Sequence, residues 1–167
     1  MSRAFVNEER FEQQSNPLLD RPISLHPNYV TPAGSAHLSK QIEHAQLLKT
    51  QYATESKKGD LSAIKHLAEI ERDLRYFEAR LESSIVVNPT AQPKNIVLFG
   101  AIVTVEDETG STQHYHIVGE DEANAQQNKV SYISPIAQAL IGKKIGDDVT
   151  WHRPAGDLTL EIKKIDY

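Results

Sequence analysis

Two histidines, His114 and His116, have the spacing of metal ligands on a strand. Alternate residues of a strand share a face, so both imidazoles would lie on one side of a sheet. A protein zinc site uses three or four side-chain ligands, and the sequence suggests no third ligand. The chain has no cysteine, which excludes disulfides, thiol nucleophiles, zinc ribbons and iron–sulfur clusters. We therefore interpret the pair as exposed strand residues and expect no cofactor bound by the chain alone.

A cluster of charged residues surrounds the glycine at position 59. Lys57 and Lys58 precede it, as is typical of the last turn of a helix. Asp60 follows it, where it would N-cap a second helix and contribute about 1 kcal/mol. Lys65 and His66 come next. Two interpretations stay open for the cations: solvated charges at helix ends, or contacts with the phosphate or carboxylate groups of a partner.

The pair Ser134-Pro135 is typical of a helix start, with serine as the N-cap and proline as the first helical residue. The single tryptophan, Trp151, lies further along the chain. We interpret Trp151 as a core or linker packing residue rather than as a platform for a ligand.

The composition limits the class of protein. The 167 residues correspond to one domain or two small parts. Apolar residues make up only 39% of the chain, which suggests that part of it is not packed around one core. The net charge is −5, whereas a protein that held nucleic acid by its phosphates would show a basic excess. No apolar stretch approaches the length of about 20 residues that spans a membrane, and the N-terminus lacks a signal-peptide run. We expect a cytoplasmic protein.

The chain divides into segments of different pattern. Residues 1–30 hold three prolines, no glycine and no sustained period, which predicts an irregular tail. Residues 31–84 begin with Thr31-Pro32, an N-cap and first helical residue, and contain two helices that meet at the charged cluster. The second helix has apolar residues at alternating spacings of four and three: Ala63, Leu67, Ile70, Leu74, Phe77 and Leu81. This seam predicts an antiparallel coiled-coil hairpin with arms of about 24 residues and about 36 Å.

A second domain is predicted over residues 96–167, after a proline-containing linker at 85–95. Its apolar residues alternate with a period of two. The pattern predicts a short helix over 135–141, and strands over 96–106, 111–118, 129–133, 148–153 and 158–167. The predicted fold class is α+β: a helical hairpin followed by a small antiparallel sheet with one short helix.

The sequence resembles the bacterial GreA/GreB transcription elongation factors. The resemblance is carried by IVLFGAIVTVEDETGSTQHYHIVGEDEAN, VSYISPIAQALIGKKIGDDV, the PAG turn and the terminal IDY. Upstream, YVTPAGSAHL resembles the start of the first helix of the family, GDLS its hairpin tip and RYFEARL its second helix.

The resemblance implies an FKBP-like C-terminal domain that binds RNA polymerase beside its secondary channel. It implies that the coiled coil enters the channel, that tip acids help hold a second Mg²⁺ at the polymerase active site, and that the polymerase then cleaves backtracked RNA. By this resemblance the chain is expected to be a monomer and not an enzyme itself. It would share a Mg²⁺ ion with the polymerase, and its tip would lie close to the 3′ end of the nascent RNA. The same resemblance places the polymerase contact at Ser134 and Pro135, beside Ile133 where the family often has a polar residue.

The tip departs from the family pattern, which has two acidic residues. Asp60 matches the first acid, and Ala63 stands at the position of the second. Glu55, about one turn before the end of the first helix, could substitute. Both arms also look one heptad short, which is about 10.5 Å of helix, whereas a carboxylate ligand must lie about 2.1 Å from Mg²⁺. These departures favour polymerase binding over cleavage stimulation.

Four functions remain open at this stage. The first is a Gre-type factor that promotes RNA cleavage and rescues arrested complexes. The second is a secondary-channel regulator without cleavage, as in Rnk-type or inhibitory Gre homologues. The third is a prolyl isomerase, which fold resemblance alone does not establish. The fourth is an interaction module that binds another protein.

Overall fold

The computed structural model describes residues 18–167, so the predicted tail lies outside the described residues up to position 17. The described chain forms two compact units. One unit contains residues 18–24 and Gln41–Ala79, and the other contains Leu25–Lys40 and Arg80–Tyr167. We call them the hairpin unit and the sheet unit. No helix of the described part is long and apolar enough to cross a membrane.

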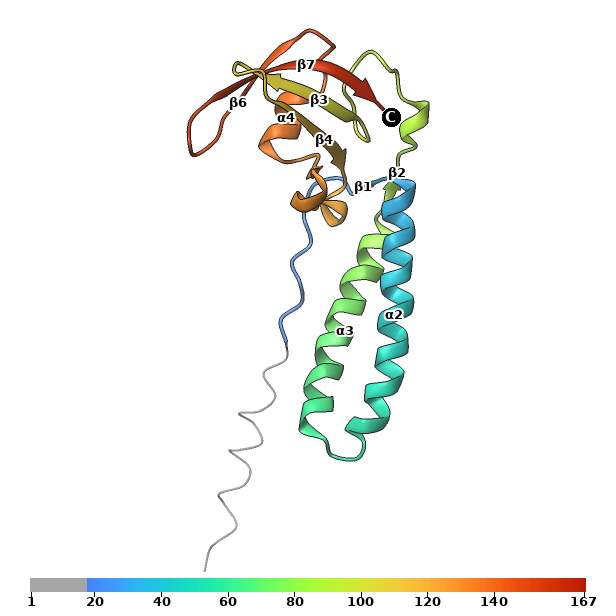
Figure 1. The fold of residues 1–167 in the computed structure, drawn as a ribbon. Coiled ribbons are helices and arrows are strands. Elements are labelled where there is room, and N and C mark those ends of the chain that lie inside the picture. The colour runs from blue at the N-terminus through green and yellow to red at the C-terminus, as the bar shows by residue number, and fades with distance from the viewer. Residues whose placement is uncertain (1–17) are drawn as a thin grey trace, which may run out of the picture. The chain divides into compact units, whose positions relative to one another are not determined.

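Two long helices form the hairpin predicted from the sequence. Helix α2 (Pro32–Ser56) and helix α3 (Leu61–Glu82) have 25 and 22 residues, or about 38 and 33 Å. They run side by side in opposite directions (Figure 1). Lys49 of α2 pairs with Glu71 of α3 at 3.1 Å. The turn between them needs a glycine at position 59, because its φ of +84° is costly for other residues.

A two-stranded parallel ladder lies where the sequence predicts only an irregular tail and a linker. Strand β1 (Tyr29–Val30) pairs with strand β2 (Ile85–Val86). The Ile85 amide donates to the Asn28 carbonyl at 2.8 Å. A short 3-10 turn, η1 (Pro89–Ala91), follows. Strands of two residues carry no measurable period, so the sequence pattern could not reveal them.

The sheet unit is built on five strands: β3 (Ile102–Asp107), β4 (Thr112–Val118), β5 (Lys129–Ser131), β6 (Asp148–Trp151) and β7 (Leu158–Asp166). Their order across the sheet is β5-β4-β3-β7-β6 (Figure 1). All neighbours are antiparallel except β4 and β5, which are parallel. Two short turns, η2 (Glu120–Glu122) and η3 (Ala125–Gln127), connect that parallel pair. The predicted α+β class is confirmed, but the sheet is mixed and not antiparallel throughout as predicted, because the turns η2 and η3 return the chain beside β4 in the same direction.

The first predicted strand starts later than the alternating pattern indicates. The prediction over 96–106 places its start at residue 96, but β3 begins at Ile102. The chain turns just before it, where Gly100 has a φ of +88° and its amide donates to the Ile117 carbonyl. This turn buries apolar residues upstream of β3, so their sequence pattern resembles that of a strand.

Helix α4 (Pro135–Leu140) covers part of the sheet and completes its core. The buried residues come from β3, β4, β6, β7, α4 and the segment before β3: Val97, Ala101, Val103, Val105, Tyr115, Ile117, Ile136, Ala137, Leu140, Val149, Leu160, Ile162 and Ile165. This core fixes the position of both ends of α4.

Candidate functional site

The predicted metal-holding residue Asp60 lies at the hairpin tip as an N-cap. Its Oδ1 accepts hydrogen bonds from the amides of Ser62 at 2.9 Å and Ala63 at 3.2 Å. Asp60 is solvent-exposed. Its carboxylate therefore stabilises the first turn of α3 through Oδ1, the oxygen that both amides share.

The residue at the second acidic position of the family pattern faces the inside of the hairpin. Ala63 is only 2% exposed, although it lies within the first turn of α3. Two nearby apolar side chains are exposed, Leu61 at 73% and Ile64 at 46%. The tip thus presents one carboxylate beside apolar side chains.

The candidate substitute Glu55 lies near the end of α2 and is half-buried. Its main-chain carbonyl accepts from the Lys58 amide at 3.0 Å, as part of the turn that ends the helix. Among residues 18–167, no group of three or more histidine, aspartate or glutamate side chains is arranged to hold a metal ion.

The cations of the tip are exposed. Lys57, Lys58 and Lys65 all face solvent. His66 lies 3.4 Å from Glu69 through its Nδ1, and its ring lies tilted against that of Tyr52, with centroids 5.4 Å apart. The exposure of the lysines is compatible with both interpretations of this cluster.

A groove lies beside α4 in the sheet unit. It has a volume of about 480 Å³ and mainly apolar walls. Ser134 and Pro135 line one side, and Trp151, Arg153 and Pro154 line another. Two of the three residues predicted to bind the partner therefore line one groove.

Local structure holds the residues of this groove in place. The Ser134 hydroxyl accepts from the Ala137 amide at 3.4 Å, so Ser134 is the predicted N-cap of α4. Ile133, the third predicted residue, is half-buried and does not line the groove. Trp151 packs edge-on against Tyr115 with ring centroids 6.1 Å apart. Trp151 therefore both packs against the core, as predicted, and forms a wall of the groove.

The two histidines of the sheet differ in environment. Thr104 Oγ1 lies 2.9 Å from Nδ1 of His114, which is exposed. His116 is half-buried, and burial together with the charge of Lys129 lowers its pKa below the ordinary 6.5. The histidine pair belongs to no metal cluster in the described residues.

A buried ion pair near the end of α3 was not predicted. The Arg80 side chain is 2% exposed. Its Nε lies 2.5 Å from Asp121 Oδ2, and its terminal nitrogen lies 3.6 Å from Glu120 Oε2. The Arg80 carbonyl also accepts from the Asn28 amide group at 2.6 Å. Arg80 therefore ties the last turn of α3 to η2 and to the segment before β1.

Glu122 completes this junction at the start of α2. Its carboxylate accepts from the Thr31 amide at 2.9 Å, from the Thr31 hydroxyl, and from the Gly119 amide at 3.2 Å. Thr31 in turn caps α2 by accepting from the Gly34 amide at 3.0 Å. A Cβ at Gly34 would lie 2.1 Å from the Glu122 carboxyl carbon, so only glycine fits. The only sequence feature that pointed to this junction was the IVG-x-DEA motif, which contains Asp121 and Glu122.

Comparisons with known proteins agree with these features. A family model described as "Transcription elongation factor, GreA/GreB, C-term" matches residues 92–167. Transcription elongation factor GreB of Pseudomonas aeruginosa is 34% identical over 150 residues, which cover 83% of this chain and 89% of that protein. The GreB of Neisseria meningitidis serogroup B is 35% identical over 153 residues, which cover 84% of this chain and 94% of that protein.

Two solved structures were also found to be similar. The transcription elongation factor GreA/GreB from Nitrosomonas europaea has 22% sequence identity and a TM-score of 0.42, covering 84% of this chain and 99% of that chain. The GreA factor homolog 1 (Gfh1) of Thermus thermophilus has 22% identity and a TM-score of 0.41, covering 85% of this chain and 100% of that chain.

Proposed function

Because the chain belongs to the GreA/GreB family of transcription elongation factors, we propose that it binds RNA polymerase at the secondary channel. In this proposal it acts as a monomer in the cytoplasm. The sheet unit docks on the polymerase, and the hairpin enters the channel. The groove that Ser134 and Pro135 line is the observation that carries the proposal.

The groove suits an apolar protein surface with an acidic rim. Its walls are mainly apolar, and the Arg153 guanidinium lies 5.4 Å from the Trp151 ring beside them. Interfaces commonly bury such aromatic and arginine side chains at their centre. Trp151 is also held by Tyr115, so this wall is already ordered in the free chain. A wall that is already ordered in the free protein reduces the conformational entropy lost on binding.

Binding to core RNA polymerase tests the proposal, with Pro135→Glu as the variant. Pro135 is exposed at the first position of α4, where an acidic residue suits the helix, so the fold should be retained. The added charge would enter the apolar groove, and we expect affinity to fall about tenfold or more, the effect of losing one interface hot spot. Lys143→Glu, an exposed change outside the groove wall, is the matched control and should bind as the wild type does.

We further propose that the bound hairpin regulates the polymerase without stimulating RNA cleavage. Stimulation would require tip carboxylates that hold Mg²⁺, a metal that lowers the pKa of an attacking water. The tip offers Asp60, whose Oδ1 already caps α3, and the inward-facing Ala63 in place of a second acid. These two features support the regulator over the cleavage-stimulating factor that the family resemblance also predicts.

A further inference from the structure

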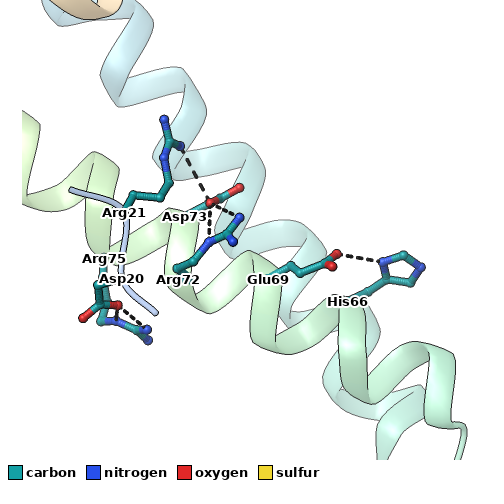
Figure 2. A network of polar contacts seen from close by, with 7 residues as sticks. All are labelled: Asp20, Arg21, His66, Glu69, Arg72, Asp73 and Arg75. Carbon is teal, nitrogen blue, oxygen red and sulfur yellow. Dashed lines mark hydrogen bonds and ion pairs between the residues drawn. The ribbon is translucent and has the colours of Figure 1, made fainter. Parts of the chain in front are cut away.

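The segment before β1 lies along helix α3 of the hairpin unit (Figure 2). The Arg21 guanidinium stacks over the Tyr76 ring at 3.8 Å from its centroid and lies 5.3 Å from the Phe77 centroid. Such a cation–π contact contributes most when it is partly shielded from water. Residues 18–24, which we call the strap, therefore have a defined docking position on α3.

Complementary charges set the register of the strap. Asp20 Oδ1 accepts from both Nε and a terminal nitrogen of Arg75, at 3.0 and 2.7 Å. The next residue has the opposite charge and the opposite partner, since Arg21 lies 3.7 Å from Asp73. A shift of the strap by one residue would place like charges together, so only one alignment satisfies both pairs. Figure 2 shows the two pairs side by side.

The contacts that hold the strap on α3 are weak enough for another ligand to displace it. The side chains of Asp20 and Arg75 are 70% and 55% exposed, and exposed ion pairs are weak because water screens them. Leu19 is 89% exposed, so the strap does not bury a large apolar side chain there. The strap is therefore ordered by contacts that another ligand of similar charge could replace.

The face of α3 beneath the strap is suited to an acidic protein surface. The hollow there has a volume of about 210 Å³ and is lined on the α3 side by Arg72, Arg75, Tyr76 and Ala79. Arg75 donates from two nitrogens into a hollow that Tyr76 also lines, which is typical of sites that bind carboxylates, whereas Arg72 is paired with Asp73 at 2.9 Å. Asp20 already occupies this site as a carboxylate ligand. The strap thus imitates the group that an acidic partner would present.

We propose that the strap is an autoinhibitory element that competes with an acidic surface of RNA polymerase for Arg75, on the face of α3 beneath the strap. This inference rests on the proposed function, because it takes the competing surface to be part of the polymerase. The strap then lowers the affinity of the free protein, and polymerase binding displaces it.

The two partners of one ion pair distinguish competition from simple stabilisation. Asp20→Ala weakens the strap and leaves α3 intact, so affinity for core RNA polymerase should rise about two- to fivefold, the range of one exposed ion pair. Arg75→Ala releases the strap but also removes a partner contact, so affinity should not rise. A pair that only stabilised the hairpin would give both variants the same effect. Lys163→Ala with Glu161→Ala, an exposed pair on β7, is the matched control.

Strap docking itself is measured by proton NMR of the full chain. The Tyr76 ring should shift the Arg21 side-chain protons upfield, and Tyr76→Leu should abolish the shift. Wild type without that shift would overturn the proposal. Equal polymerase affinity of wild type and Asp20→Ala would also overturn it while leaving the proposed function intact. If neither protein bound the polymerase, the proposed function would fall, and the strap's role with it.

Discussion

At the residue scale, Arg80 carries the most consequential charge of the sheet unit. Its side chain is 2% exposed and lies against Asp121 and Glu120, which are themselves mostly buried. Arg80→Met would leave two carboxylates without their cation, and we expect the free energy of unfolding to fall by about 3 kcal/mol. Urea denaturation measures this. Arg75→Met removes an exposed arginine of the same helix and should cost less than about 1 kcal/mol.

Gly34 gives a second residue-scale prediction. A Cβ at this position would overlap the Glu122 carboxylate, which caps the junction through Thr31 and Gly119. Gly34→Ala should therefore lower the free energy of unfolding by about 1–3 kcal/mol, as overpacking does, even though alanine favours helices. A thermal melt of Gly34→Ala that matched or exceeded wild type would contradict this role of Glu122.

The pH dependence of stability should reflect His116. Its pKa is lowered in the folded protein from the ordinary value of 6.5, first by burial and then by the charge of Lys129. The unfolded chain therefore binds the proton more readily, so stability is fully present above pH 6.5 and falls as pH drops through the lowered value. His116→Gln should flatten the change in urea midpoint between about pH 7.5 and pH 5.5. His114→Gln, on the same strand, controls for the loss of an imidazole, and an equal flattening there would refute the assignment.

At the scale of elements, the structure of the hairpin tip predicts that an acidic residue at position 63 would destabilise the fold. Ala63 is 2% exposed and faces into the hairpin, whereas Ile64 is 46% exposed. Ala63→Glu should lower stability by about 1–3 kcal/mol, the cost of burying a polar group without partners. Ile64→Glu should change it by less than about 0.5 kcal/mol. Paired thermal melts test this, and equal melting temperatures would show that Ala63 is not confined.

Elements with long periodic patterns were predictable from the sequence, and those held by distant contacts were not. The apolar seam from Ala63 to Leu81 runs through α3, and Thr31 and Asp60 mark where the helices begin. The β1–β2 ladder joins residues more than fifty positions apart through two residues each, too few for any period. The ion pair of Arg80 could not be predicted for the same reason, because its acidic partners lie some forty positions away in the sequence.

The candidate site was predictable to a similar extent. Ser134 and Pro135 were predicted as partner contacts because a helix start and the family motif coincide there. The structure places both in one groove, and their role in binding stays a prediction. Trp151 was predicted only as a packing residue, since no local pattern shows that β6 brings it beside α4. The strap lay within the predicted irregular tail, because alternating charges without a period do not reveal which helix they meet.

At the scale of the whole molecule, the account predicts a protein that occupies the polymerase channel without supplying the missing acid. In the proposed function the groove of the sheet unit docks on the polymerase and the hairpin reaches into the channel, and in the further inference the strap lowers the affinity. The tip presents Asp60 as a helix cap. The groove, the tip and the strap can each be tested separately, and channel occupation without cleavage is the claim that joins them.

The most direct test is RNA cleavage in a backtracked elongation complex with the matching polymerase, Mg²⁺ and this protein, alone and in competition with an active Gre factor. We predict no shortened transcripts with this protein alone, and a dose-dependent loss of the cleavage that the active factor promotes. Pro135→Glu should lose that competition in proportion to its weaker binding. Mg²⁺-dependent shortening by this protein alone, abolished by Asp60→Ala, would contradict the account.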